Sequence, residues 1–148
     1  MVLDCTGRLG WLAGRLLADL GAEVIKLEVP GADVSSTDWC ALNVNKRLVQ
    51  CDPTDPGGRR TLDQLAASAD ILIATPRPEP DEARLFDYAR LSAINARLIV
   101  VAITPFGLTG PKADWHASDI EIMAAGGAMS LAGEPDGAPL RVSAPQSY

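Results

Sequence analysis

The stretch DCTGRLGWLAGRLLADLGAEVIKLE, residues 4–28, follows a short apolar run and decides the fold. A glycine-bearing turn comes first. Apolar residues then recur at helical spacing up to Gly21, a plausible helix end: Leu12, Leu16, Leu17 and Leu20. Residues 23–28, EVIKLE, alternate and contain β-branched side chains, which is typical of a strand. The order strand, turn, helix, strand predicts the first βαβ unit of a parallel sheet.

The glycine spacing of this turn differs from that of a dinucleotide-binding fingerprint. That fingerprint, G-x-G-x-x-G, needs its second glycine where the backbone approaches a pyrophosphate. Here Gly7 is followed by Arg8 and Leu9, and the next glycine is Gly10. A leucine side chain would occupy the place of the phosphates, so the spacing disfavours NAD. An NAD-dependent oxidoreductase that places Glu28 against a ribose stays as the alternative.

The rest of the chain continues the alternation of strands and helices. Strands are predicted at RLVQCD (47–52), DILIA (70–74) and ARLIVVAI (96–103), and helices through 62–66, over 82–93 and over 118–131. Loops are predicted at 29–40 and 104–115, which are rich in turn-forming residues. The pattern predicts a single α/β domain with a Rossmann-like, mostly parallel sheet and helices on both faces.

Composition narrows the class of protein. The chain has 148 residues, of which 47% are hydrophobic and 22% charged, as in ordinary soluble domains. The net charge of −6 and the lack of a basic run argue against a nucleic-acid partner. No apolar segment is long enough for a membrane span and no signal peptide is recognisable. An odd number of cysteines without C-x-x-C spacing (Cys5, Cys40 and Cys51) favours a cytoplasmic location, with the thiols as small buried hydrophobes.

Common catalytic patterns are sparse. His116 is the only histidine, no G-x-S-x-G elbow or Walker A loop is present, and no ligand set for a metal is recognisable. Lys46 and Arg47 precede a strand and could hold a phosphate, but a solvated surface pair is an equally good interpretation. Asp119 follows Ser118 and is predicted to cap or begin a helix.

Several stretches together resemble the family III CoA-transferases, which include carnitine–CoA transferases, formyl-CoA transferases and α-methylacyl-CoA racemase. LLADLGAEVIKLEVPGAD (16–33) is similar to the family's N-terminal signature, and NVNKRLVQCDPTDPGGRRTLDQLAASADILIATPRP (43–78) to its next strand, helix and strand. The stretches LSAINARLIVVAITPFGLTGPKADW (91–115) and AGGAMSLAGEPDGAPLRVS (125–143) resemble the two that follow. The resemblance covers nearly the whole chain in order.

The resemblance implies a fold, a reaction and a site. Residues 1–148 would form the N-terminal part of the large domain, without the small domain and the C-terminal return. In the family a carboxylate attacks an acyl-CoA thioester and passes through mixed-anhydride and aspartyl-CoA intermediates. CoA or acyl-CoA would be a substrate, with a small carboxylic acid as acceptor and no tightly bound cofactor. The adenine and phosphate end would lie near Lys46, Arg47, Cys51, Asp52, Pro53 and Thr54, and the pantetheine near Thr75, Pro76 and Arg77.

The chain departs from the family pattern at functional positions. Counting without gaps from Gly137, the nucleophilic aspartate would fall on Tyr148, and RVSAPQSY (141–148) has no acidic residue. Thr75-Pro76 replaces the usual Asn-Phe pair. Ala117-Ser118-Asp119 stands where racemases have Gly-His-Asp, which disfavours racemase activity. Family members are longer and form interlocked homodimers, so the chain is expected to be a fragment, a truncated reading frame or the first unit of a longer protein.

Four functions therefore stay open. The complete protein could transfer CoA with an aspartate outside this segment, or this segment could be a non-catalytic half that binds CoA or dimerises. The oxidoreductase and a purely structural α/β module are the remaining two. The resemblance favours the first pair and does not identify the acyl group or the acceptor. It also predicts that the isolated chain self-associates, because an interlocked partner normally covers apolar surface.

Overall fold

The computed structural model describes residues 1–76, 84–134 and 136–141. The chain divides into two compact units, Met1–Thr104 and Pro105–Tyr148. The first unit contains the whole sheet and every residue that lines the site described below. Arg77 and Tyr148, which the sequence analysis singled out, lie outside the described residues.

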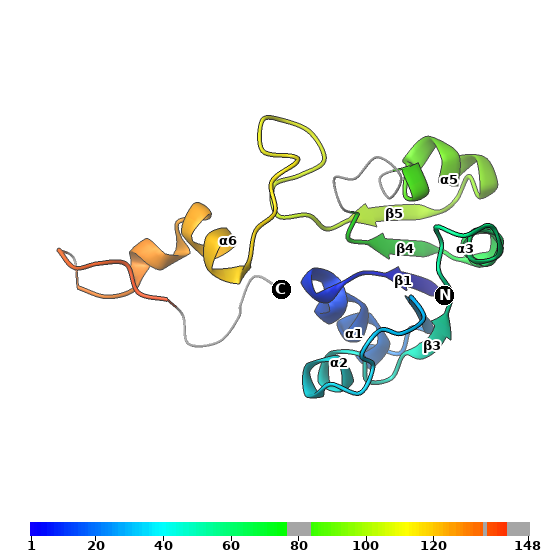
Figure 1. Ribbon diagram of the computed structural model, residues 1–148, viewed down its shortest axis with the longest axis horizontal. Helices are drawn as coiled ribbons and strands as arrows, with labels where there is room; N and C mark the ends of the chain where they lie inside the picture. The colour runs from blue at the N-terminus through cyan, green and yellow to red at the C-terminus, as the bar shows by residue number, and fades with distance from the viewer. Residues whose placement is uncertain (77–83, 135, 142–148) are drawn as a thin grey trace. The chain divides into compact units, whose positions relative to one another are not determined.

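The sheet of the first unit has five parallel strands in the order β3-β2-β1-β4-β5 (Figure 1). Their bounds are β1 Val2–Cys5, β2 Val24–Glu28, β3 Arg47–Gln50, β4 Ile71–Ala74 and β5 Ile99–Ala102. The chain winds outward from β1 to β3, then crosses to β4 on the other side of β1 and continues to β5. This arrangement confirms the predicted α/β class with a Rossmann-like parallel sheet.

Helices connect the strands. In the first unit they include η1 Arg8–Gly10, α1 Trp11–Asp19, α2 Thr37–Leu42, α3 Pro56–Ser68 and α5 Tyr88–Ile94. The second unit contains α6 Asp119–Ala125 and η2 Ala128–Leu131. Helix α5 begins after Asp87, which caps it by accepting from the Arg90 amide at 2.9 Å. The start of the helix predicted over 82–93 lies outside the described residues.

Two predictions on these helices were wrong. The predicted loop 29–40 contains most of α2, which Ser36 caps by accepting a hydrogen bond from the Trp39 amide. The serine that favoured a loop is therefore a helix start signal. The predicted single helix over 118–131 ends at Ala125, because Gly127 adopts a φ of 78°, and η2 follows. Asp119 is the first residue of α6, as expected of a first-turn residue.

Each face of the sheet has its own core, because strand residues alternate between faces. One face carries Leu3, Ile25 and Leu72, which pack with residues of α3 and α5 such as Leu62 and Leu91. The other face carries Val2, Val24 and Ile73, which pack with Ala18 and Leu17 of α1. Helices therefore cover both faces, as predicted. On the second face, the next inward positions along β1 and β2 are Asp4 and Lys26.

Helix α1 turns its small residues inward. Its buried residues are Gly14 and Ala18, whereas Leu16 is 54% exposed and Leu20 is 85% exposed. The leucine stripe that predicted the helix is thus mostly on its outer side. Small residues face the sheet because the charged pair Asp4 and Lys26 lies beneath this helix, and Gly14 leaves room for Asp4. Within the described residues, no helix combines the length and apolarity that a membrane crossing requires.

Candidate functional site

A pocket of about 200 Å³ opens at the carboxyl edge of the sheet. It is lined by residues that end the strands or follow them, together with two from the segment before α5: Cys5, Thr6, Gly7, Leu27, Glu28, Val29, Asp52, Pro53, Thr54, Thr75, Leu85 and Phe86. Open α/β sheets bind ligands at this edge, where the strand order reverses. Here the reversal lies between β1 and β4. Ligand pockets typically have about 300–1,000 Å³, so this one suits part of a large ligand.

A hydrogen bond joins the two loops at the reversal point. The amide of Gly7, after β1, donates to Thr75 Oγ1, after β4, at 2.6 Å. Both residues line the pocket. Thr75 therefore links the loop after β1 to the loop after β4 and fixes the width of the pocket between them.

Replacing Thr75 with valine is expected to lower the free energy of unfolding by about 1 kcal/mol, since the Gly7 amide loses its acceptor. Valine keeps the shape of the side chain, and Thr75→Ser keeps the hydroxyl and should retain most of the stability. Urea denaturation measures both variants. Equal stability of the valine and serine variants would contradict a role for this hydrogen bond.

The turn after β3 forms another wall. Asp52 Oδ1 accepts from the amide of Thr54 at 2.8 Å and from its hydroxyl at 2.6 Å. The hydrogen bonds from Thr54 lower the pKa of Asp52, so its carboxyl group is ionised near neutral pH. Behind the turn, a Cβ atom on Gly58 of α3 would lie 1.8 Å from the Asp52 carbonyl oxygen. Only glycine at position 58 allows α3 to approach this turn so closely.

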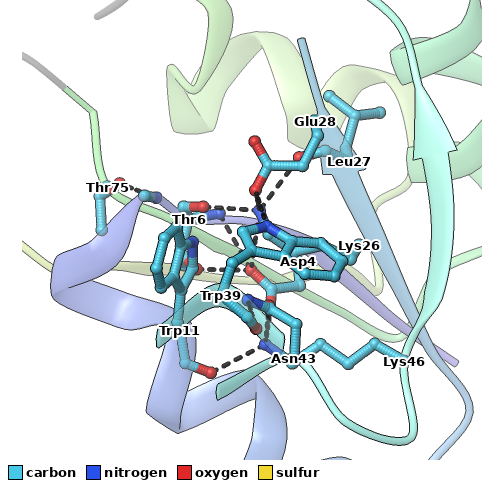
Figure 2. A network of polar contacts seen from close by, with 11 residues as sticks. Asp4, Thr6, Trp11, Lys26, Leu27, Glu28, Trp39, Asn43, Lys46 and Thr75 are labelled. Atoms are coloured by element: carbon cyan, nitrogen blue, oxygen red, sulfur yellow. Dashed lines mark hydrogen bonds and ion pairs between the residues drawn. The ribbon is translucent and has the colours of Figure 1, made fainter. Parts of the chain in front are cut away.

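A buried network of charges lies beneath the pocket (Figure 2). Asp4 and Lys26 are register partners on neighbouring strands, and both are fully buried. Asp4 Oδ1 accepts from the amide and the hydroxyl of Thr6. Lys26 Nζ donates to the carbonyl oxygens of Thr6 at 2.6 Å and Leu27 at 3.0 Å. The network thus holds the backbone of the loop after β1, which lines the pocket.

Lys46 completes this network from the end of the α2–β3 connection. Its Nζ donates to Asp4 Oδ2 at 2.7 Å, to the Trp11 carbonyl at 2.8 Å and to Asn43 Oδ1 at 2.7 Å. Its side chain is 1% exposed. Burial lowers the pKa of Lys46, and the Asp4 carboxylate counters part of that shift. All three ammonium hydrogens have acceptors within the protein, so none is left for a phosphate.

Glu28 connects the network to the pocket. Its Oε1 lies 3.2 Å from Lys26 Nζ and accepts from Trp39 Nε1 at 3.0 Å. Its carboxyl group lies at the end of β2, and the residue lines the pocket. From the sequence, Glu28 was a candidate only for contact with the ribose of NAD in the oxidoreductase alternative.

The predicted site residues divide into three groups. Asp52, Pro53, Thr54 and Thr75 meet at the pocket. Four others are not part of its lining: Lys46, Arg47, Cys51 and Pro76. Lys46 is buried in the network, and Arg47 pairs with Glu23 on the surface at 2.8 Å. Cys51 Sγ lies 3.9 Å from the Gly58 carbonyl oxygen. Arg77 lies outside the described residues. The ligand roles predicted for these residues stay predictions.

The thiol in the described lining of the pocket, Cys5, is a poor nucleophile. Burial raises the pKa of the Cys5 thiol well above its usual range, which keeps the thiol protonated and poorly nucleophilic. Across the described parts of the chain, no three His, Cys, Asp or Glu side chains are grouped to hold a metal ion. The pocket is therefore equipped for binding, with hydrogen-bond acceptors and an apolar wall.

Comparison with known proteins identifies relatives over the whole chain. The family model described as CoA-transferase family III matches residues 1–148. A succinate–glutarate CoA-transferase of Agrobacterium fabrum is 34% identical, over 87% of this chain and 37% of its own length. A subunit of succinyl-CoA:(R)-benzylsuccinate CoA-transferase from Thauera aromatica is 33% identical, over 99% of this chain and 40% of its own length. The chain thus spans about 40% of the length of these relatives.

A solved structure agrees with these matches. The crystal structure of a CAIB/BAIF family protein from Brucella suis superposes with a TM-score of 0.87 and 34% identity. The match covers 97% of this chain and 42% of that protein. The resemblance inferred from the quoted stretches is confirmed by both comparisons. This chain belongs to the CoA-transferase family III.

Proposed function

We propose that this chain binds part of a CoA thioester in its pocket, and that the complete protein transfers CoA between an acyl-CoA and a small carboxylic acid. The observation that carries the proposal is that two segments, 52–54 and Thr75, meet at one pocket at the reversal point of the sheet. The family resemblance assigns both segments to CoA. Membership of the family supports the reaction, and the relatives' names pair CoA with succinate, glutarate and oxalate.

The nucleophile of the reaction is proposed to come from outside this segment. A carboxylate adds to the thioester carbonyl and expels the CoA thiolate, which leaves a mixed anhydride. The thiolate then attacks the aspartyl carbonyl of this anhydride, which forms the aspartyl-CoA and releases the donor carboxylate. The acceptor carboxylate attacks the aspartyl-CoA to give a second mixed anhydride and expels the thiolate. Attack of the thiolate on the acceptor's carbonyl carbon forms the new acyl-CoA and regenerates the enzyme carboxylate. Counted without gaps from Gly137, the family position would fall on Tyr148, whose phenol cannot form such a thioester. This segment alone is therefore expected to bind without transferring.

The same proposal extends to the ligands and the assembly of the intact protein. CoA and acyl-CoA act as substrates, and no cofactor is held tightly. The intact protein forms the interlocked homodimer that the resemblance implies, in the cytoplasm. A non-catalytic half that binds CoA is the second candidate.

Calorimetric titration of the full chain with CoA tests the proposal, once near-ultraviolet circular dichroism has shown a packed fold. CoA is expected to bind and NAD is not. Arg47→Ala tests the phosphate contact that the resemblance implies for Arg47, which is 74% exposed and pairs with Glu23: weaker CoA binding would support that contact. Pro53→Gly, in the pocket wall, is expected to weaken binding about tenfold by loosening the turn. Binding of NAD in place of CoA would restore the oxidoreductase, and binding of neither would contradict the proposal.

A further inference from the structure

The wall that the segment before α5 contributes to the pocket is apolar. Leu85 and Phe86 line the pocket from this segment, and Leu85 is 2% exposed. Both side chains pack with the core on the sheet face that α3 and α5 cover. A wall that is already in place favours binding, because ordering it when the ligand arrives costs free energy. The contacts that hold Leu85 and Phe86 therefore affect how tightly the pocket binds.

Arg90, in the first turn of α5, holds the backbone of this segment. Its Nε and Nη2 both donate to the Leu85 carbonyl oxygen, at 3.3 and 2.7 Å. Its own amide donates to Asp87 Oδ1, which fixes the start of the helix. The Arg90 side chain is 22% exposed, so water competes only in part for these hydrogen bonds. The planar guanidinium is rigid and loses little entropy when it holds an acceptor with two donors.

The third contact of Arg90 connects the segment to α3. Arg90 Nη1 donates to Asp63 Oδ1 of α3 at 2.6 Å, and the two helices lie side by side (Figure 1). Nearer its start, α3 carries Gly58, which lies close against the Asp52 carbonyl. Asp52 belongs to the turn that forms another wall of the pocket. Helix α3 is thus in contact with that turn and, through Arg90, with the apolar wall.

We infer that Arg90 is a positioning residue: it holds the Leu85–Phe86 wall in place against α3 and thereby sets the affinity of the pocket for CoA. Arg90 is not part of the described lining, so its effect passes through the Leu85 backbone. Without Arg90 the wall leaves its place in a larger fraction of molecules, and the apparent affinity falls with the fraction that keeps it. The inference rests on the proposed function, because its ligand is CoA.

Trypsin digestion of the full chain tests the positioning without a ligand. The peptide bond after Arg84 is protected while Leu85 stays buried, so its cleavage rate measures how often the segment opens. Arg90→Met is expected to raise this rate at least about tenfold, because hydrogen bonds to a charged group are among the stronger ones. Arg90→Lys keeps the charge but lacks the two-donor fork, so it should raise the rate less. Mass spectrometry identifies the cleaved bond.

Calorimetric titration measures the effect on the ligand. Arg90→Met is expected to weaken CoA binding about tenfold, and Arg90→Lys less. The matched control is Asn95→Ala. Asn95 Nδ2 donates to the carbonyl oxygens of Ala66 and Ala69, at 3.1 and 2.8 Å, so it also connects α5 to α3, but at the edge of the sheet where β5 begins. This control should lower stability in urea while the cleavage after Arg84 and the CoA affinity stay unchanged.

The outcomes separate this inference from the proposed function. Unchanged cleavage after Arg84 in Arg90→Met overturns the inference, and so does unchanged CoA affinity in a variant whose segment opens. Equal effects of Arg90→Met and Asn95→Ala show a general loss of stability and also overturn it. If Arg90→Met does not fold, Arg90→Lys decides by the same two measurements. CoA that fails to bind the unaltered chain contradicts the proposed function, whereas faster cleavage in Arg90→Met still supports the positioning by Arg90.

Discussion

Replacing Asp4 with alanine is expected to lower the free energy of unfolding by about 3–5 kcal/mol, since it leaves buried ammonium groups without their carboxylate. Lys46 loses its contact at 2.7 Å, and Lys26 loses an ion pair at 3.9 Å. Both side chains are 1% exposed, so water cannot replace Asp4 without opening the structure. Urea denaturation followed by circular dichroism measures the loss. The loss is a large part of the stability of a typical domain.

Matched variants show whether burial of charge is the cause. Glu23→Ala removes a carboxylate from an exposed pair with Arg47 and is expected to change stability little. Asp4→Asn keeps the acceptor for Thr6 and should lose less than the alanine variant. Adding Lys46→Met to Asp4→Asn removes the unpaired ammonium and should recover part of the loss. A double variant that is less stable than Asp4→Asn alone would contradict this explanation.

The parallel strands and the helices that cover both faces of the sheet were predictable because they depend on local patterns. Apolar runs at 70–74 and 96–103, separated by helical stretches, specify parallel strands with little ambiguity. Helix α2 was missed because its cap, Ser36, stands in a Ser/Thr/Asp cluster that equally favours a loop. The choice depends on contacts such as the hydrogen bond from Trp39 to Glu28, which lies on the preceding strand.

The charged network shows why residue type alone does not assign a role. A lysine before a strand can bind a phosphate of a ligand or pair with a buried carboxylate of the protein. Lys46 pairs with the carboxylate because Asp4 lies within reach of its ammonium group. One signal was available in the sequence. Asp4 directly follows the first apolar run and Lys26 lies in the predicted strand 23–28, and the structure pairs them on neighbouring strands of one βαβ unit. Gly14 in α1 adds to this signal, because a residue without a side chain at that position leaves room for the Asp4 carboxylate.

The pocket was partly predictable for a different reason. Segments 52–54 and Thr75 follow parallel strands, and such segments gather at one edge of the sheet whatever their sequence. The contacts of Glu28 were less accessible, because Trp39, which donates to its carboxylate, comes from a helix that was not predicted. The contribution of Leu85 and Phe86 depends on how the segment before α5 folds back, which no short pattern specifies.

Replacing Gly58 with alanine is expected to lower the free energy of unfolding by about 2–3 kcal/mol and to weaken ligand binding at the pocket. The added Cβ would lie 1.8 Å from the Asp52 carbonyl oxygen and 2.4 Å from its carbon. Both are backbone atoms, so the clash cannot be relieved by rotating a side chain. Either α3 or the Asp52–Thr54 turn has to move, and that turn lines the pocket.

The neighbouring glycine provides the control for this experiment. A Cβ on Gly57 meets nothing within 4 Å, and Gly57 lies in the same helix. Gly57→Ala should therefore stabilise the protein by about 0.5 kcal/mol, because alanine has less conformational freedom to lose. Urea denaturation and calorimetric titration with CoA compare the two variants. Equal stability and equal affinity would show that the turn shifts freely, and the pocket would then not be a preformed site.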